Sequence, residues 1–559
     1  MKNEKAEPIL NLALSLSKQD GIEDEALTAG YDFATNMWEI IVKYNGDIKK
    51  YETSKIQIEL LKFGYAIVTI QEELIDTFLQ AKEIEYAEKP KLFLPQNVQS
   101  LAKSGVFSLW NQPYRLTGKG VYVGIIDSGI DYMSPAFIRD NQTSRIAVLY
   151  DQTTNQVFTN EQINQALLLN EILPITDPSG HGTAVASIAA GVLDDFRGIA
   201  YEADLVVVKL DQKNQNSFPL TTALLRGVDA CIDYAYQMGK PIAINISFGN
   251  TYGAHNGESL VEQYINEAAN YGRNVICVGT GNEGESAGHT SGTLTAYEKR
   301  SIEFAVGMYE RELSLQLWHP FAEKLRVTLL AVDGQIVFEL GENFINQIVK
   351  KKVGATTIIA FGGGPTPYSG WREVYFSFKG EEHIMAGVWK VILESVSKRK
   401  IAYRMYLPAQ KIKSQATRFL EPNPEQTFTI PSTARNVISV GAYDSTLEAY
   451  AQFSGRGVVE KQNGEGVTYV KPDLAAPGVL VEAVLGNEIV AVSGTSFATP
   501  YVTGVCALLM EWGIIQGNDP YMYGQKLKAY LQARATALSG GAFIPNEMIG
   551  YGALNGFIF

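Results

Sequence analysis

Between about residues 97 and 290, continuously apolar runs alternate with stretches of helical spacing. The apolar runs are 121–127, 204–210, 241–248 and 274–281. Strands buried on both faces of a parallel sheet have this composition. The stretch 259–272 has helical spacing, with one apolar face formed by Leu260, Val261, Tyr264, Ile265 and Ala268. The pattern predicts an α/β fold, in which helices cover both faces of a mostly parallel sheet.

The pattern changes on either side of this block. Residues 1–96 predict a small α+β unit with strands at 38–44 and 65–70 and a helix at 72–82. We place its boundary at Leu94-Pro95-Gln96, because proline ends regular structure.

A second change occurs at about residue 291, where short β-rich stretches are separated by Gly, Pro and charged turns. They predict an antiparallel sandwich or jelly roll inserted into the α/β domain. After residue 428 the earlier pattern resumes. The chain therefore divides into four segments, 1–96, 97–290, 291–428 and 429–559.

Composition and charge exclude several classes of protein. Of 559 residues, 46% are hydrophobic and 19% charged, so the chain has the material for a large core. Its net charge of -13 disfavours nucleic acid and anionic membranes as partners. Cys231, Cys277 and Cys506 lie in apolar stretches, and we expect buried thiols, neither disulfides nor metal ligands.

No targeting or membrane segment is expected. The apolar stretch at 9–16 is short, is interrupted by Asn11 and has no cleavage site after it. No window holds 18 uninterrupted apolar residues. We therefore expect a soluble protein without a secretion signal.

Three motifs carry the chemistry. Asp127, in Ile-Asp-Ser-Gly, ends a buried strand, where open α/β sheets place their ligands. His181, in Ser-Gly-His-Gly-Thr, opens a helix of small residues and is one of only five histidines. Ser496, in Gly-Thr-Ser-Phe-Ala-Thr-Pro, precedes another apolar helix. Taken singly, each residue could instead be a helix cap or a packed side chain.

Together the three motifs resemble those of subtilisin-like serine proteases, whose triad runs Asp, His, Ser along the chain. The resemblance implies that His181 removes the proton of Ser496 and that Asp127 orients the imidazole. We expect no cofactor and no metal among the catalytic groups, and the sequence leaves bound calcium open.

Asn282, in the segment Gly-Thr-Gly-Asn-Glu-Gly, matches the family asparagine that donates its amide to the oxyanion. The same segment fits the dinucleotide fingerprint GxGxxG, but the residues after it lack helical spacing, which disfavours that alternative. Ser247, Phe248 and Gly249 resemble the segment that pairs with an extended substrate and forms a wall of its first specificity pocket. We assign a structural role to 471–478.

The resemblance extends to the layout of the chain. Residues 1–96 resemble a prodomain that assists folding, and we expect self-cleavage between Gln96 and Asn97, with the prodomain kept bound as an inhibitor. The layout is most similar to the Csp proteases of clostridial spores. That likeness implies a spore-associated protease whose protein substrate is the zymogen of a cortex-lytic hydrolase, activated during germination. The alternative is a catalytically idle scaffold that binds a germination partner or germinant.

Overall fold

The computed structural model describes residues 35–61, 64–89, 104–211, 219–461, 467–539 and 543–556, with isolated positions between 3 and 32. The chain forms two compact units, Met1–Pro95 and Gln96–Phe559.

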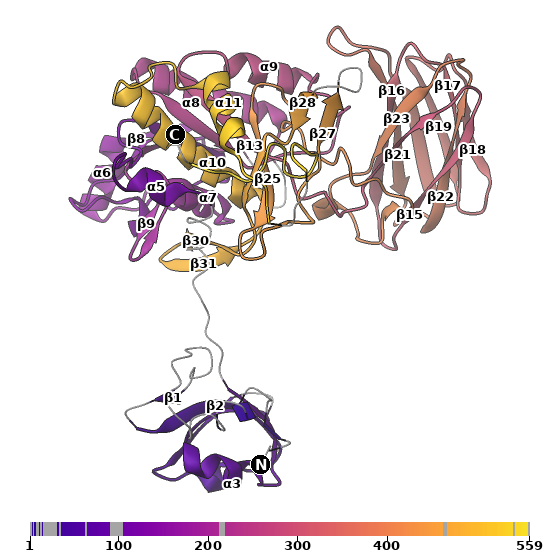
Figure 1. The fold of residues 1–559 in the computed structure, drawn as a ribbon. Coiled ribbons are helices and arrows are strands. Elements are labelled where there is room, and N and C mark those ends of the chain that lie inside the picture. Colours follow the sequence, from indigo (N-terminus) through magenta and orange to yellow (C-terminus); the bar gives the residue numbers. More distant parts are fainter. Residues whose placement is uncertain are drawn as a thin grey trace. The chain divides into compact units, whose positions relative to one another are not determined.

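The first unit is a small antiparallel sheet with a short helix (Figure 1). Alternation along β2 (Met37–Tyr44) buries Trp38, Ile40 and Val42 on the inner face. The remaining elements are β1 (Tyr31–Asp32), β3 (Ile56–Leu60), β4 (Tyr65–Gln71), β5 (Ile84–Glu88) and α3 (Ile75–Leu79).

The helix expected over 72–82 is shorter in the structure. A 3-10 turn, Glu72–Leu74, comes first, and α3 ends at Leu79. Because Ile84 already pairs with Tyr44 of β2, the chain has to turn over residues 80–83. Tertiary pairing therefore overrides the helical spacing.

The second unit is built on a nine-stranded sheet in the order β26-β25-β13-β12-β6-β11-β7-β8, with β29 paired to β25. All pairings are parallel except β7 with β8 and β25 with β26. The strands are β6 (Tyr122–Asp127), β7 (Ile146–Asp151), β8 (Gln156–Thr159), β11 (Asp204–Lys209), β12 (Ile242–Ile246), β13 (Asn274–Gly279), β25 (Ile438–Asp444), β26 (Ala449–Tyr450) and β29 (Leu474–Pro477).

Helices cover both faces of this sheet. One core joins it to α7 (His181–Ala190) and α10 (Thr495–Met510). A second core joins its other face to α8 (Thr221–Gln237) and α9 (Leu260–Ala268). Leu260 is expected on the packed face of α9 but is 66% exposed. It directly follows the N-cap Ser259, at the end of the helix, whereas Ile265 in the middle of the helix is buried.

One segment, Thr495–Ile515, is long and apolar enough to cross a membrane by composition. Its most apolar window is 83% buried by the rest of the chain. In the fold it is the central core helix, and it carries Ser496 in its first turn.

Between β13 and β25 the chain leaves the parallel sheet to form two antiparallel sheets, which share one apolar core (Figure 1). Their orders are β14-β23-β16-β21-β20-β19 and β18-β17-β22-β15-β24. These strands are β14 (His289–Leu294), β15 (Lys299–Val306), β16 (Glu312–Pro320), β17 (Leu325–Leu330), β18 (Ile336–Leu340), β19 (Gln347–Val353), β20 (Thr356–Gly362), β21 (Trp371–Gly380), β22 (Gly387–Ser395), β23 (Ile401–Tyr406) and β24 (Arg418–Phe419). We call this region, residues 289–419, the sandwich.

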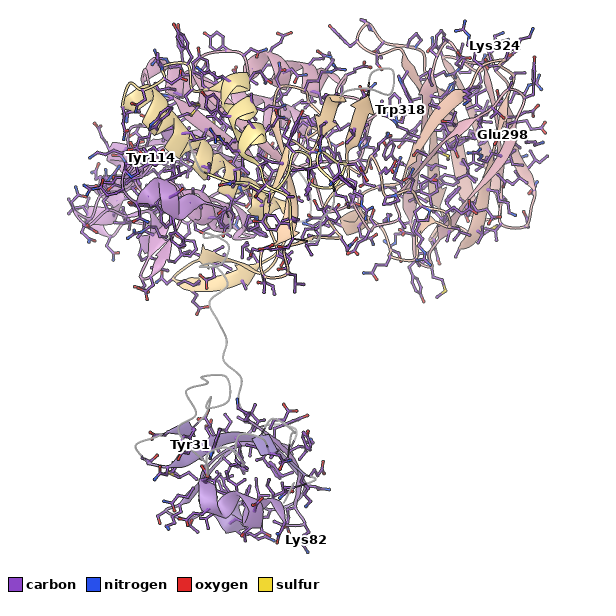
Figure 2. All side chains as sticks on the ribbon, in the orientation of Figure 1. Tyr31, Lys82, Tyr114, Glu298, Trp318 and Lys324 are labelled. Carbon is purple, nitrogen blue, oxygen red and sulfur yellow. The ribbon has the colours of Figure 1, made fainter. Side chains whose placement is uncertain are left out.

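The sandwich contacts the loop after β12 through polar groups. Gln316 Nε2 donates to the Thr251 carbonyl at 3.2 Å, and Arg404 Nη1 donates to the Ala254 carbonyl at 2.9 Å. Trp318, two residues after Gln316, lies on the side of the sandwich nearer the parallel sheet, whereas Glu298 and Lys324 lie farther from it (Figure 2). These hydrogen bonds hold the sandwich beside the segment that follows β12.

Candidate active site

Asp127 and His181 form a close pair at one edge of the parallel sheet. Asp127 is the last residue of β6 and fully buried, and His181 is the first residue of α7. His181 Nδ1 lies 2.7 Å from Asp127 Oδ1. The glycine at 182 allows the approach, because a Cβ there would lie 2.1 Å from the Gly129 carbonyl oxygen.

A second carboxylate, Asp177, organises the surroundings of this pair. Its Oδ2 accepts from the backbone N–H and hydroxyl of Thr183 at 2.8 and 2.6 Å. Its Oδ1 lies 2.7 Å from the hydroxyl of Ser128, which lies 3.2 Å from Asp127 Oδ1. A hydroxyl has one proton, and the shorter distance assigns that proton to Asp177.

Asp127 consequently keeps few hydrogen bonds of its own. Its Oδ1 accepts from the Ser128 backbone N–H at 2.7 Å and faces His181, and its buried Oδ2 has no partner among the described residues. An under-solvated carboxylate is a strong acceptor, so the imidazole is its main source of stabilisation.

Neighbouring charges shift the pKa of the His181 imidazole. Burial lowers the pKa of His181, but the charge and hydrogen bond of Asp127 outweigh burial and raise it above its ordinary value. Asp177 adds to the rise, and the charge of Lys411 opposes it. The ring also lies against Phe248 and Phe497, with centroids 5.8 and 5.3 Å away.

Ser496 is the second residue of α10, between Thr495, whose backbone N–H donates to Asn282, and Phe497, whose backbone N–H donates to the Gly494 carbonyl. Its hydroxyl donates to the Ser247 carbonyl at 3.2 Å, and the Ser247 hydroxyl donates back to the Ser496 carbonyl at 2.9 Å. Among the described residues, no hydrogen bond joins Ser496 to His181. Such contacts are often loose without substrate, and a rotation about χ1 redirects the hydroxyl.

Asn282 lies on the loop after β13 with its side chain fixed by the start of α10. Its Oδ1 accepts from the backbone N–H and the hydroxyl of Thr495 at 3.0 and 3.1 Å. Both donors occupy the amide oxygen, so the Nδ2 group is left to donate. A Cβ added at Gly494 would lie 3.3 Å from Nδ2, which places this donor beside the turn that carries Ser496.

Ser247, Phe248 and Gly249 directly follow β12. Ser247 faces Ser496, Phe248 packs against His181, and Gly249 is exposed. The structure therefore brings this segment to the same edge as Asp127, His181, Ser496 and Asn282.

Other sequence expectations concern structural groups. The three cysteines are free and buried, which confirms the prediction made from their apolar surroundings. No helix follows the glycines at 279–284, where the chain turns and enters β14, so no helix N-terminus would meet a pyrophosphate. Within the described residues, no group of three His, Cys, Asp or Glu side chains could hold a metal ion. Gln96 and Asn97 lie outside the described residues.

Three residues of the site, Asp177, Ser128 and Thr495, could not be assigned a role from the sequence. Thr495 stands beside the predicted nucleophile, and Asp177 precedes His181 by four residues. Neither position shows its role before the fold is known, since the partners Asn282 and Ser128 come from distant segments. Proximity to a candidate residue is the only signal the sequence offers.

Comparisons with known proteins agree with this geometry. The model of the subtilase family matches residues 118–358 and 414–552, and that of the Csp protease B prodomain matches 4–91. The solved structure of the Clostridium perfringens CspB protease is similar, with a TM-score of 0.76 and 34% identity over 82% of this chain and 95% of that one.

Curated relatives match over shorter stretches. The subtilase-type proteinase RRT12 of Saccharomyces cerevisiae is 35% identical over 20% of each chain. The serine protease AprX of Bacillus subtilis is 34% identical over 30% of this chain and 34% of its own. This chain thus spans about a fifth to a third of these relatives' lengths.

The fold and the matches define a subtilisin-like α/β protein of the serine protease class. The chain belongs to the subtilase family and carries a prodomain of the CspB type. The fold class expected from the sequence is confirmed.

Proposed function

We propose that this protein is a serine endopeptidase with Asp127, His181 and Ser496 as its triad and Asn282 as an oxyanion donor. The observation that carries the proposal is the 2.7 Å contact between His181 and the buried Asp127 beside the helix start that presents Ser496. The fixed amide of Asn282 completes the set.

The chemical step follows from these positions. The Ser496 hydroxyl turns from the Ser247 carbonyl to His181 Nε2 and gives up its proton as its oxygen bonds to the substrate carbonyl carbon. The imidazolium, held by Asp127, then donates that proton to the leaving amine nitrogen as the C–N bond breaks. Water then bonds to the acyl carbon while His181 takes its proton, and the bond from that carbon to Ser496 Oγ breaks as His181 returns the proton to Oγ.

Negative charge develops on the carbonyl oxygen in both half-reactions. The Asn282 Nδ2 group and the free backbone N–H of Ser496 are the donors available to it. The N-terminus of α10 adds a favourable field. Because Thr495 already occupies the Asn282 amide oxygen, the donor is oriented before the substrate binds.

We infer that the substrate is a protein zymogen, specifically that of a spore cortex-lytic hydrolase, cleaved during germination. The similarity to the Clostridium perfringens CspB protease and the CspB-type prodomain support this inference. A location in the spore would follow from the same function.

We propose that the protease cleaves its own chain at Gln96–Asn97 and that the released prodomain stays bound as an inhibitor. The outer face of its sheet supports this, since Ile41, Tyr65 and Tyr86 are 42%, 44% and 37% exposed. Apolar side chains gathered on one sheet face favour continued association over release.

A fluorophosphonate probe tests the endopeptidase and separates it from the idle scaffold. The probe bonds only to an activated serine, so the wild type should be labelled and Ser496→Ala should not. His181→Ala should lose nearly all labelling, because the hydroxyl then lacks its base. Ser377→Ala on β21 is the matched control, since it removes a hydroxyl from the sandwich and none from the candidate site. A wild type that is both unlabelled and uncut at Gln96–Asn97 would favour the scaffold, because a prodomain that stays bound after self-cleavage can shield the serine from the probe.

A further inference from the structure

One face of the sandwich carries half-buried aromatic side chains. It is the outer face of the sheet β14-β23-β16-β21-β20-β19, because every second side chain of these strands points the other way, into the sandwich core. On β23 and β16, this face bonds to the loop after β12 through Arg404 and Gln316. The outer face continues past that contact onto β21, the next strand of the sheet.

The register of the strands places Glu373 of β21 among aromatic rings. Its cross-strand neighbour on β16 is Trp318. Side chains directly opposite each other in an antiparallel pair have Cβ atoms about 4.5–5.5 Å apart. Trp371 and Tyr375 lie two residues before and after Glu373, and therefore on the same face. Three aromatic side chains thus flank the Glu373 carboxylate.

The remaining side of Glu373 faces a glycine. Just after β20, the Gly363 backbone N–H donates to the Glu373 carbonyl at 2.8 Å. Glycine has no side chain, so no group at this position pairs with the carboxylate. The nearest ring on this side is that of Phe361, the cross-strand neighbour of Tyr375. The surroundings of the carboxylate are therefore apolar on both sides.

The Glu373 carboxylate has no partner for its charge among the described residues. Burial raises its pKa to about 7, and no neighbouring charge or hydrogen bond contributes to that shift. The cation in the same row of the sheet, Arg404, lies beyond Trp318 and donates to the Ala254 carbonyl. A partly desolvated anion without a partner gains free energy when a cation reaches it.

The same face already holds one guanidinium. Arg404 lies over the ring of Trp371, 4.7 Å from its centroid. A planar guanidinium stacks on aromatic rings and pairs with a carboxylate through two parallel hydrogen bonds. Trp318 and Tyr375 beside Glu373 offer a second guanidinium both kinds of contact. The net charge of -13 also favours the approach of a basic protein.

We propose that Glu373, Trp318 and Tyr375 form a docking site for an arginine side chain of a protein partner. The site gives the sandwich a binding role of its own. This role goes beyond the proposed endopeptidase function and does not depend on it, because no triad member belongs to the sandwich.

The test measures the binding of three acetylated and amidated peptides, Gly-Ser-X-Ser-Gly with Arg, Lys or Gln at X. The full chain carries Ser496→Ala, so that no peptide is cleaved. Calorimetry at about pH 8, where the Glu373 carboxylate is mostly ionised, and at about 0.15 M salt gives each Kd. The Arg peptide should bind more tightly than the Lys peptide, and about 10-fold or more tightly than the Gln peptide.

Substitutions on the same background separate charge from ring. Glu373→Gln keeps the shape of the side chain and should weaken binding of the Arg peptide by about 10-fold. Trp318→Leu should weaken it several-fold, whereas Trp318→Phe keeps a ring and should retain most of the affinity. Glu339→Gln on β18 is the matched control, since it removes an exposed carboxylate from the other sheet of the sandwich, and binding should not change.

Three results would overturn the docking site. The Arg and Gln peptides could bind equally well, or Glu373→Gln could bind the Arg peptide like the unsubstituted sandwich. Equal losses in Glu373→Gln and Glu339→Gln would show attraction to net charge in place of a site. None of these measurements uses the triad, so their failure leaves the endopeptidase function standing, and failure of the fluorophosphonate test leaves the docking site standing.

Discussion

At the level of single residues, substitution of Asn282 should change catalysis without changing the folding of the chain. Replacing it with alanine removes the proposed oxyanion donor and leaves the residues of the Asp127–His181 contact in place. Turnover should fall by about 10²- to 10³-fold, the loss measured when the equivalent donor is removed from subtilisin. The measurement is kcat on a peptide substrate, with the thermal midpoint recorded alongside.

Two results would contradict this assignment. If Asn282→Ala turned over substrate like the wild type, Asn282 would not be an oxyanion donor. If the thermal midpoint of Asn282→Ala dropped sharply, the hydrogen bonds between Asn282 and Thr495 would serve mainly to stabilise the fold.

The Asp177 carboxylate should shift the pH dependence of the reaction. His181 can act as a base only in its unprotonated form, so we expect activity to rise with pH through the raised pKa of His181. Asp177→Asn removes a negative charge that raises this pKa, while Lys411 still lowers it. The substitution also frees the Ser128 hydroxyl to donate to Asp127. Asp127 then stabilises the His181 imidazolium less strongly.

Both effects lower the pKa of His181, so the acid limb of kcat/KM against pH should move to lower pH. The control is Asp229→Asn on α8, which covers the opposite face of the sheet from α7. An acid limb that coincides with that of the wild type would limit Asp177 to a structural role.

At the scale of elements, a buried charge cluster joins α11 (Gly524–Arg534) to the parallel sheet. Asp473 Oδ2 lies 2.7 Å from Lys471 Nζ, and its Oδ1 lies 2.9 Å from Lys528 Nζ. Burial raises the pKa of Asp473, but the charges of the two lysines outweigh burial, so the pKa lies below its ordinary value. The carboxylate stays ionised in the folded state, so it stabilises above its ordinary pKa, and this stabilisation is lost as pH falls through the lowered value.

Asp473→Asn should therefore lower the free energy of unfolding near neutral pH by about 3–5 kcal/mol. Lys528 loses its counterion, and Lys471, whose pKa burial already lowers to about 7, has to give up its proton when the carboxylate is gone. Urea unfolding measures this. Asp519→Asn is the matched control, since it breaks the surface pair with Lys526 at 2.5 Å and should cost about 1 kcal/mol or less. Equal losses in the two variants would refute the structural role that we assign to 471–478.

The strands and the chemistry differed in how far the sequence could predict them. Continuous apolar runs gave β6, β11, β12 and β13 within a residue or two, because burial on both faces leaves few alternatives. The helix predicted over 72–82 ends at Leu79, because the pairing of Ile84 with Tyr44 cannot be read from the local sequence.

At the scale of the whole molecule, self-cleavage should depend on the molecule's own nucleophile. Purified wild type should contain two fragments that meet at Gln96–Asn97, whereas Ser496→Ala should remain one chain of 559 residues. Intact-mass analysis measures both. Gel filtration then reports whether the fragments stay together, as the exposed apolar sheet face predicts.

Two outcomes argue against autoprocessing. One is a wild type that stays whole, and the other is a Ser496→Ala chain cut at the same bond, which would point to a different protease.

The tied ends of the sandwich have a consequence for the order of folding. β13 and β25 are parallel neighbours, although the chain between Gly279 and Ile438 builds the sandwich. The sandwich's entry and exit lie together, since Phe419 N–H donates to the Ala287 carbonyl and Asn423 N–H to that of His289, both at 2.9 Å. Once folded, the sandwich acts as a short connection and lowers the entropic cost of closing this pair by roughly 2 kcal/mol. The nascent chain therefore gains by completing the sandwich before β25 joins the sheet and the helix bearing Ser496 packs against it.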